Sequence, residues 1–155
     1  MNKKEILILS NLRKNGREKL TNISKETSIP VSTIFDKIKS YEASLIIKRH
    51  SCLLNFSKLG YEIDVCLLIK SEKDEREKLK EFLEQKNCLN SIFRITSSYD
   101  FLVEGIFKDM QELHDFLEKM EETFNLTRIE VLYIVGELKR ENFLINNTEA
   151  KYERI

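Results

Sequence analysis

Side chains that could contact a polyanion recur between residues 20 and 49. The candidate DNA contacts are Thr21, Val31, Ser32, Thr33, Asp36, Lys37, Lys39, Ser40, Lys48 and Arg49. Hydroxyl and amine groups donate to phosphate oxygens, and on a helix in the major groove they can also reach base edges. Asp36 could accept a hydrogen bond from cytosine N4, and Lys37 could donate to guanine or pair with a phosphate. Such chemistry predicts a surface that binds duplex DNA.

The same residues also fit an ordinary solvated helix face. Asp36 could pair locally with Lys39 or Ser40, and pairs of this kind contribute only tenths of a kcal/mol. The helix-turn-helix pattern of the surrounding sequence favours the interpretation as a DNA-binding surface.

A second polar cluster, Ser97-Ser98-Tyr99-Asp100, lies between two apolar runs. Asp100 could fix the amino group of a small effector, and Ser97 or Ser98 could hold its carboxylate. An ordinary polar hairpin turn has the same composition, so both interpretations stand.

Residues suited to catalysis or metal binding are sparse. His50 and His114 lack the neighbouring Cys, Asp or Ser of a nucleophilic site, and the four glycines are too far apart for a phosphate-binding loop. Cys52, Cys66 and Cys88 form no CxxC pair and lie among apolar residues, so we expect reduced core thiols. The sequence predicts no catalytic residue, no metal, no cofactor and no enzyme.

The DNA candidates are positioned by a predicted helix-turn-helix. Helices are expected over residues 3–14 and 21–27, with Thr21 as the N-cap of the second. Ser28-Ile29-Pro30 is a tight break, and the helix that follows carries Ile34, Ile38 and Tyr41 on one face. An apolar run ending in Lys-Arg-His within residues 42–50 looks like a β-wing. Residues 1–52 therefore read as a winged helix-turn-helix domain.

The remainder alternates strand and helix patterns. Strands are expected at 63–69, 92–96, 101–107 and 126–135, with helices at 73–86 and from Asp109 onward. The order βαββαβ predicts a ferredoxin-like domain over residues 62–136, after a hinge at 53–61. Residues 137–155 would form a tail with, at most, a short edge strand. The fold class is α+β.

One face of this sheet should lack helices and yet be apolar. Ile129, Val131 and Tyr133 are expected there, opposite Leu132 and Ile134. A sheet that is apolar on both faces usually packs against another sheet, so we expect a homodimer or a larger assembly, such as a tetramer or octamer.

Charge is divided between the halves of the 155-residue chain. Residues 1–60 hold 12 Lys and Arg against 5 Asp and Glu, whereas residues 61–155 hold 14 against 21. A basic half suits DNA and an acidic half suits assembly or sensing, although a chance distribution gives the same numbers. The absence of a long apolar run or a secretory leader predicts a cytoplasmic protein without a membrane partner.

Several short segments, in order, resemble the Lrp/AsnC (feast/famine) family of transcriptional regulators. They are Glu5, Ile8-Leu9, Leu12, Asn15-Gly16-Arg17, Ile23-Ser24, Ser32-Thr33-Ile34, Lys37-Ile38-Lys39, Ile46, Lys58-Leu59-Gly60-Tyr61 and Thr96–Val103. Three positions differ from the family pattern. Ser97 and Ser44 stand where the family has Gly, and Pro30 replaces a polar helix cap. Because Gly permits close backbone approach, Ser97 alters the expected effector turn.

The resemblance implies a sequence-specific transcription regulator that binds DNA as a dimer or higher oligomer, with an amino acid as a possible effector near Ser97–Asp100. Two alternatives remain open. One is an architectural protein that wraps DNA with low specificity, and the other is a ligand-sensing assembly module that does not bind DNA.

Overall fold

The computed structural model describes residues 1–96 and 98–145. Contacts between residues divide the chain into two units. The helical unit comprises Met1–Leu53 together with the segment that begins at Leu138, and the sheet unit comprises Leu54–Glu137. The sheet unit is therefore inserted, in sequence, into the helical unit.

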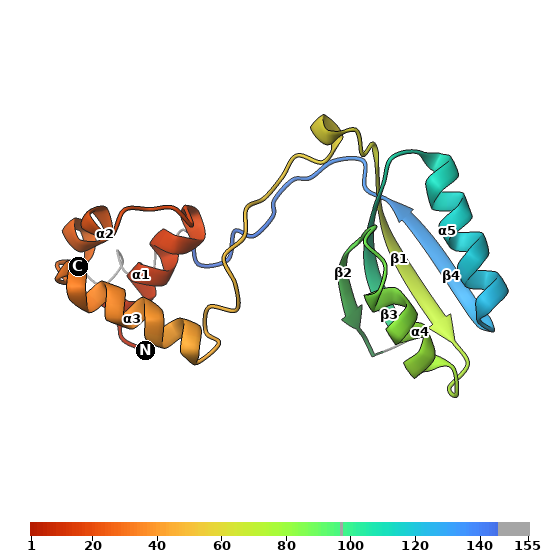
Figure 1. Ribbon diagram of the computed structural model, residues 1–155, viewed down its shortest axis with the longest axis horizontal. Coiled ribbons are helices and arrows are strands. Elements are labelled where there is room, and N and C mark those ends of the chain that lie inside the picture. Colours follow the sequence, from red (N-terminus) through yellow and green to blue (C-terminus); the bar gives the residue numbers. More distant parts are fainter. Residues whose placement is uncertain (97, 146–155) are drawn as a thin grey trace, which may run out of the picture. The chain divides into compact units, whose positions relative to one another are not determined.

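The helical unit contains α1 (Lys3–Lys14), α2 (Leu20–Thr27) and α3 (Val31–Ala43), as Figure 1 shows. A capping box begins α1: the Asn2 side chain accepts from the Glu5 amide at 2.9 Å, and Glu5 accepts from the Asn2 amide at 2.8 Å. The predicted N-cap of the second helix was wrong, because Thr21 lies inside α2 and Lys19 occupies the cap position without a side-chain hydrogen bond.

The core of this unit consists of isoleucines contributed by all three helices and the α2–α3 turn. Its fully or nearly buried members are Ile8, Ile23, Ile29 and Ile34, with Leu12, Leu20 and Ile38 packed against them. These are the positions at which helical periodicity places apolar residues on one side, so burial follows the sequence pattern closely.

The predicted break between α2 and α3 is a tight turn. Ser28 adopts a left-handed conformation with φ of 55°, and its amide donates to the Ser24 carbonyl at 2.8 Å. The Ser24 hydroxyl donates to the Ile29 carbonyl at 2.6 Å, so the turn is fixed from both sides. Pro30 then stands at the N-cap of α3, where its missing N–H leaves no unpaired donor.

The expected β-wing is not formed. Residues 44–53, all of them described, contain turns and bends but no strand. Leu45 and Ile46 are 71% and 50% exposed. A strand is stable only when a partner pairs with it, and no described segment of the helical unit pairs with this run.

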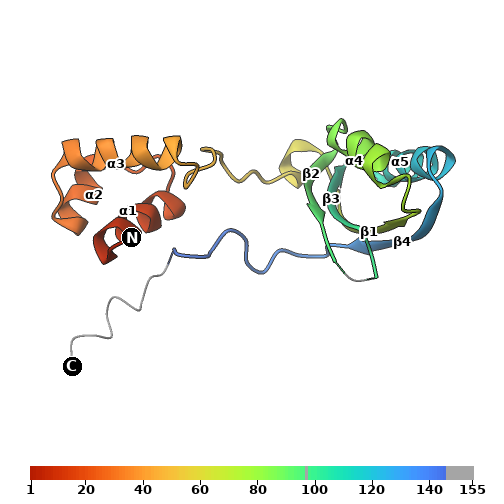
Figure 2. The ribbon, with the colours of Figure 1, turned by 90° about the horizontal axis from the view of Figure 1, so that it is seen from below.

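The sheet unit has the predicted βαββαβ order. Its elements are β1 (Ile63–Ser71), α4 (Arg76–Glu84), β2 (Leu89–Arg94), β3 (Phe101–Phe107), α5 (Met110–Thr123) and β4 (Leu126–Tyr133), preceded by the short 3-10 turn η1 (Ser57–Leu59). The strands are antiparallel in the order β2-β3-β1-β4. Both helices cover the same face of the sheet (Figure 2), which confirms the ferredoxin-like α+β class.

Strand register identifies the two faces of the sheet and corrects one prediction. Leu67 pairs with Val131 and Ile69 with Ile129, and all four belong to or pack against the core beneath α4 and α5. Ile129 and Val131 therefore lie on the covered face. The assignment of Ile129, Val131 and Tyr133 to the bare face was wrong.

The face without helices, here called the open face, carries apolar side chains at its centre and charged ones beside them, among them Glu104 and Glu130. Leu68 pairs with Leu102 at its centre, across the two middle strands. Its further apolar members, assigned by register, are Cys66, Phe93, Ile106 and Leu132. Phe93 is 55% and Leu132 is 49% exposed, so apolar side chains of this face reach solvent in the single chain.

The segment after the sheet unit returns to α1. Arg13 donates from Nη2 to the Glu141 carbonyl at 2.9 Å and from Nε to the Phe143 carbonyl at 3.2 Å. Its Nη1 also pairs with the Glu141 carboxylate at 2.7 Å, and the Ser10 hydroxyl donates to the Ile145 carbonyl at 3.2 Å. Residues 137–145 form no strand. The remainder of the predicted tail, residues 146–155, lies outside the described residues.

The three cysteines are free thiols. Cys52 is exposed, which corrects the expectation of a core thiol, whereas Cys66 and Cys88 are partly buried. Burial raises the pKa of both partly buried thiols. In the described residues no group of three His, Cys, Asp or Glu could hold a metal ion, and no helix is long and apolar enough to cross a membrane.

Candidate nucleic-acid interface

The third helix of the helical unit has a buried side and a solvent side. Ile34 and Tyr41 are buried against the rest of the unit. The predicted contacts on α3, apart from Lys37, are all exposed: Val31, Ser32, Thr33, Asp36, Lys39 and Ser40. The side of α3 that could enter a groove therefore carries three hydroxyl groups, one ammonium and one carboxylate.

Lys37 is less available than the other candidates. Its ammonium pairs with the Glu5 carboxylate at 2.5 Å, and the two side chains are only 31% and 19% exposed. The hydrogen bond to Glu5 raises the pKa of Lys37, and the same bond lowers the pKa of Glu5. Lys37 thus connects α3 to the first turn of α1, and its charge is neutralised within the unit.

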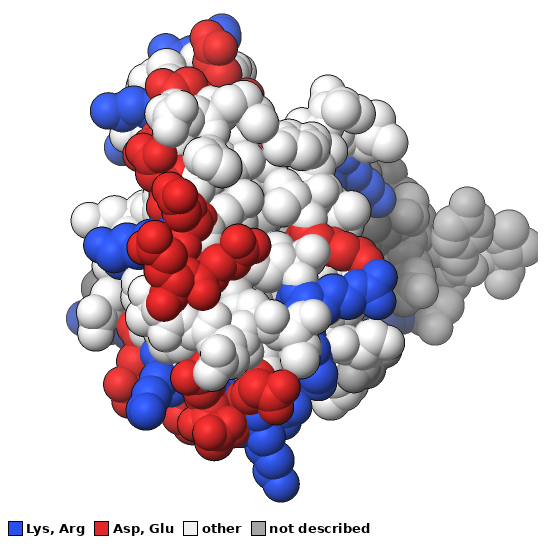
Figure 3. Space-filling view, turned by 90° about the vertical axis from the view of Figure 1, so that its right-hand side faces the viewer, with Lys and Arg blue, Asp and Glu red and all other residues white. Residues whose placement is uncertain are grey.

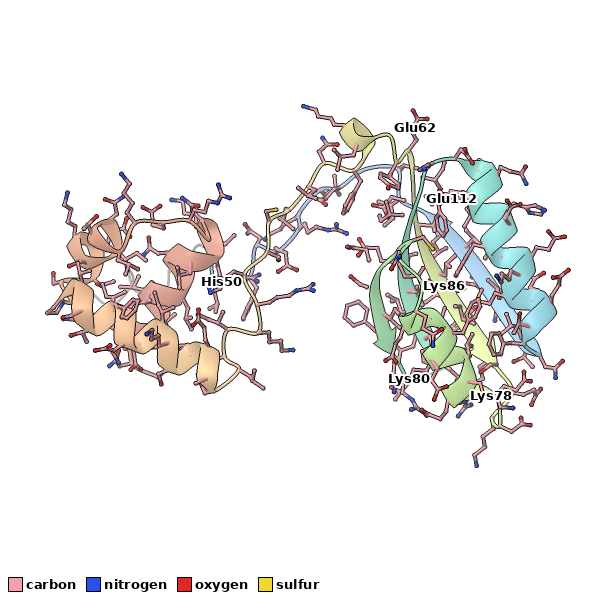
Figure 4. All side chains as sticks on the ribbon, in the orientation of Figure 1. His50, Glu62, Lys78, Lys80, Lys86 and Glu112 are labelled. Atoms are coloured by element: carbon pink, nitrogen blue, oxygen red, sulfur yellow. The ribbon has the colours of Figure 1, made fainter. Side chains whose placement is uncertain are left out.

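Three further candidates lie outside α3. Thr21 is exposed on the first turn of α2, and Lys48 and Arg49 are exposed in the segment after α3. Next to them His50 (labelled in Figure 4) hydrogen-bonds through Nε2 to the Glu42 carboxylate at 2.8 Å. His50 therefore contacts the last turn of α3.

One exposed residue of α3 was missed by sequence reasoning. Phe35 is 48% exposed, and the Lys39 ammonium lies 4.5 Å from the centre of its ring. A signal was available in the sequence, because Phe35 is the apolar residue of this helix that falls outside the stripe formed by Ile34, Ile38 and Tyr41.

The predicted effector turn has a different arrangement from the one expected. Asp100 is buried, and its carboxylate pairs at 3.0 Å with both the Lys70 ammonium and the Arg76 guanidinium. It also accepts from the Ser71 amide at 3.2 Å. Burial by itself would raise the pKa of Asp100, but the hydrogen bonds from Lys70 and Ser71 and the charge of Arg76 hold it below its ordinary value.

The other residues of this turn are dispersed. Ser98 is exposed, and Ser97 lies outside the described residues. The Arg128 guanidinium carbon lies 5.2 Å from the centre of the Tyr99 ring, and Arg128 in turn pairs with Glu130. The Tyr99 hydroxyl and then the Arg128 charge lower the pKa of Glu130, so this end of the open face is an internally neutralised cluster.

The sheet unit presents an acidic surface. Figure 3, which faces the side bearing α5 and β4, shows acidic side chains gathered in a band. Glu112 lies in the first turn of α5, and the Asp109 side chain caps this helix by accepting from the Glu112 amide. A negative surface repels phosphate, so DNA contacts are expected from the helical unit alone.

Comparison with known proteins gives relatives for both units. Residues 64–144 match the Lrp/AsnC ligand binding domain. The HTH-type transcriptional regulator FL11 of Pyrococcus furiosus is 32% identical over 111 residues, which cover 72% of this chain and 74% of that protein. An uncharacterised HTH-type transcriptional regulator of Pyrococcus abyssi is 24% identical over 136 residues, covering 88% of this chain and 92% of that protein.

Solved structures show the same fold. A transcriptional regulator of Neisseria meningitidis, crystallised with L-Met, superimposes with a TM-score of 0.83 at 21% identity, covering 90% of this chain and 93% of that one. AsnC of E. coli gives a TM-score of 0.79 at 16% identity, covering 90% and 95%. Since the matched ligand-binding domain spans residues 64–144 and FL11 is 32% identical over 72% of the chain, this protein belongs to the Lrp/AsnC family of transcriptional regulators.

Proposed function

We propose that this regulator recognises a two-fold symmetric DNA sequence with two copies of α3, supplied by a homodimer joined through the open face of the sheet. The observation that carries the proposal is the exposed polar side of α3, which lies in the basic part of the chain. Residues 1–60 carry 12 Lys and Arg against 5 Asp and Glu, which favours approach to phosphate. The phosphate contacts are Thr21, Lys39, Ser40, Lys48 and Arg49, and the base contacts come from Ser32, Thr33 and Asp36.

Selection from a pool of random duplex DNA tests this proposal. The wild-type protein is bound to the pool at about 0.15 M salt, and the retained duplexes are sequenced. We expect an enriched motif with two half-sites about one helical turn apart, or a multiple of it, because a dimer axis relates the two reading helices. Retention without a motif would support the architectural alternative, and no retention would support the assembly module.

Lysine substitutions on α3 should differ in their effect on salt dependence. We expect Lys39→Ala to lower the slope of log affinity against log salt by about one, as for loss of one phosphate contact. Lys37→Ala should change the slope less, because Glu5 already neutralises this ammonium, and it should lower the thermal midpoint of the helical unit instead. Titrations of the selected duplex at several salt concentrations measure both slopes.

A matched control comes from the acidic part of the chain. Lys78 is exposed on α4 (labelled in Figure 4), so Lys78→Ala removes one positive charge away from the proposed interface. Its slope should equal that of the wild type. Equal slopes for Lys39→Ala and Lys78→Ala would remove Lys39 from the set of phosphate contacts.

Amino-acid sensing by the turn at residues 97–100 remains a prediction. The Neisseria meningitidis regulator was crystallised with L-Met. If a similar ligand binds this turn, we expect it to contact Ser98 and Tyr99. The amino group of such a ligand could reach Asp100 only by displacing Lys70 or Arg76. Calorimetric titration of the protein with single amino acids tests the prediction, and heat that persists unchanged in Ser98→Ala and Tyr99→Phe would place the ligand elsewhere.

A further inference from the structure

The exposed side of α3 carries an apolar strip as well as polar groups. Val31 is 39% and Phe35 is 48% exposed, and their spacing of four residues places them on the same side of the helix. Lys39 follows at the same spacing, with its ammonium 4.5 Å from the centre of the Phe35 ring. The strip flanks Ser32 and Asp36, which are also exposed.

Lys39 restricts what can occupy this strip. An ammonium over an aromatic ring is held by the ring quadrupole, and it limits the motion of the Phe35 side chain. The strip therefore has a positive charge at one end. It belongs to residues 1–60, in which Lys and Arg outnumber Asp and Glu by 12 to 5. A second copy of this helix would bring like charges together, whereas the DNA major groove combines phosphates at its edges with apolar groups on its floor.

The apolar group that the major groove offers is the 5-methyl group of thymine, and a side chain such as Phe contacts it directly. We propose that Phe35, backed by Val31, reads a thymine methyl group in each half-site while Lys39 pairs with a neighbouring phosphate. This inference rests on the proposed DNA binding and adds a specificity-determining residue to it. It predicts that the enriched motif has a T·A pair at one symmetric position in each half-site.

Replacement of thymine by deoxyuridine tests the contact, because this change removes the methyl group and keeps every hydrogen-bonding group. In the selected duplex each thymine is replaced singly, and then in both half-sites. At one position we expect affinity to fall by about fourfold per half-site, the effect of burying one methyl group. With Phe35→Ala the thymine duplex should bind more weakly, and the same replacement should have no further effect.

Two further variants separate base reading from folding and from charge. Phe35→Leu keeps an apolar side chain and should retain part of the preference for thymine over deoxyuridine. Leu53→Ala removes a 63% exposed apolar side chain elsewhere in the helical unit, and it should keep the wild-type preference. Thermal unfolding of each variant, and an unchanged salt slope in Phe35→Ala, would show that neither folding nor phosphate contacts have changed.

The outcomes distinguish this inference from the proposed function. Binding of a symmetric motif with no effect of deoxyuridine at any position would overturn the role of Phe35 and leave the proposed function standing. The same holds if Phe35→Ala keeps the wild-type preference for thymine, or if it changes only the size of the assembly. Absence of any DNA binding by the wild type would overturn both.

Discussion

Leu68→Asp should convert the assembly to monomers and weaken binding to the selected duplex by about 100-fold. Leu68 pairs with Leu102 at the centre of the open face, where a carboxylate would have to be buried between two copies. Affinity falls because a monomer binds one half-site and loses the advantage of linking two reading helices. Light scattering coupled to size exclusion measures the mass, and a binding titration measures the loss.

The variant should still fold, because Leu68 lies on the face that α4 and α5 do not cover, and its circular dichroism should match the wild type. Met110→Asp is the matched control: Met110 is 51% exposed at the start of α5, where a negative charge favours the helix N-terminus. We expect Met110→Asp to keep both mass and affinity. An unchanged mass for Leu68→Asp would mean that copies associate through another surface.

Asp100→Ala should destabilise the sheet unit by about 2–4 kcal/mol, because it leaves two partly buried cations and the Ser71 amide without their acceptor. Lys70 and Arg76 are 29% and 28% exposed, so water replaces the lost carboxylate only in part. For a domain of this size the thermal midpoint should fall by roughly 10–20 °C. Asp74→Ala, at an exposed turn position, should leave the midpoint nearly unchanged.

The pH dependence of this effect follows from the lowered pKa of Asp100. Its pKa in the folded protein lies below the ordinary value of 3.8, so its charge stabilises the fold fully at pH values above 3.8 and loses that effect as pH falls through the folded pKa. In urea unfolding, the difference in unfolding free energy between wild type and Asp100→Asn should be constant near neutral pH and shrink below 3.8. A difference that does not depend on pH would show that the charge of Asp100 is not what stabilises the unit.

Local signals in the sequence predicted most of the elements. The helix predicted over residues 3–14 and the helix before the break at Ser28 both end where expected, and the third predicted strand has the observed bounds Phe101–Phe107. These features depend on neighbouring residues, because caps, turns and alternation act over a few positions. Long-range pairing was not accessible in the same way. The faces of β4 were reversed, since apolar residues occur on both, and only the pairing of Val131 with Leu67 decides which face is covered.

The candidate sites were likewise predictable where they depend on neighbouring residues, and not where they depend on residues distant in the sequence. The exposed side of α3 follows from helical periodicity, whereas the neutralisation of Lys37 depends on Glu5, 32 positions earlier. Asp100 was predicted to bind the amino group of an effector. In the structure its carboxylate pairs with Lys70 and Arg76, which lie 30 and 24 positions away in the sequence. The prediction of a β-wing was wrong for a related reason. A strand pattern in the sequence does not show whether a second strand is available to pair with it.

The contacts of Arg13 with Glu141 and Phe143 have a consequence for biosynthesis. On the ribosome α1, α2 and α3 emerge first, and they can collapse around their isoleucine core at once. The partners of Arg13 are translated only after the whole of β4, so the helical unit acquires its last contacts when the sheet unit is already made. A nascent or truncated chain that lacks residues 138–145 would have an incomplete DNA-reading unit, which couples the maturation of this unit to completion of the sheet unit.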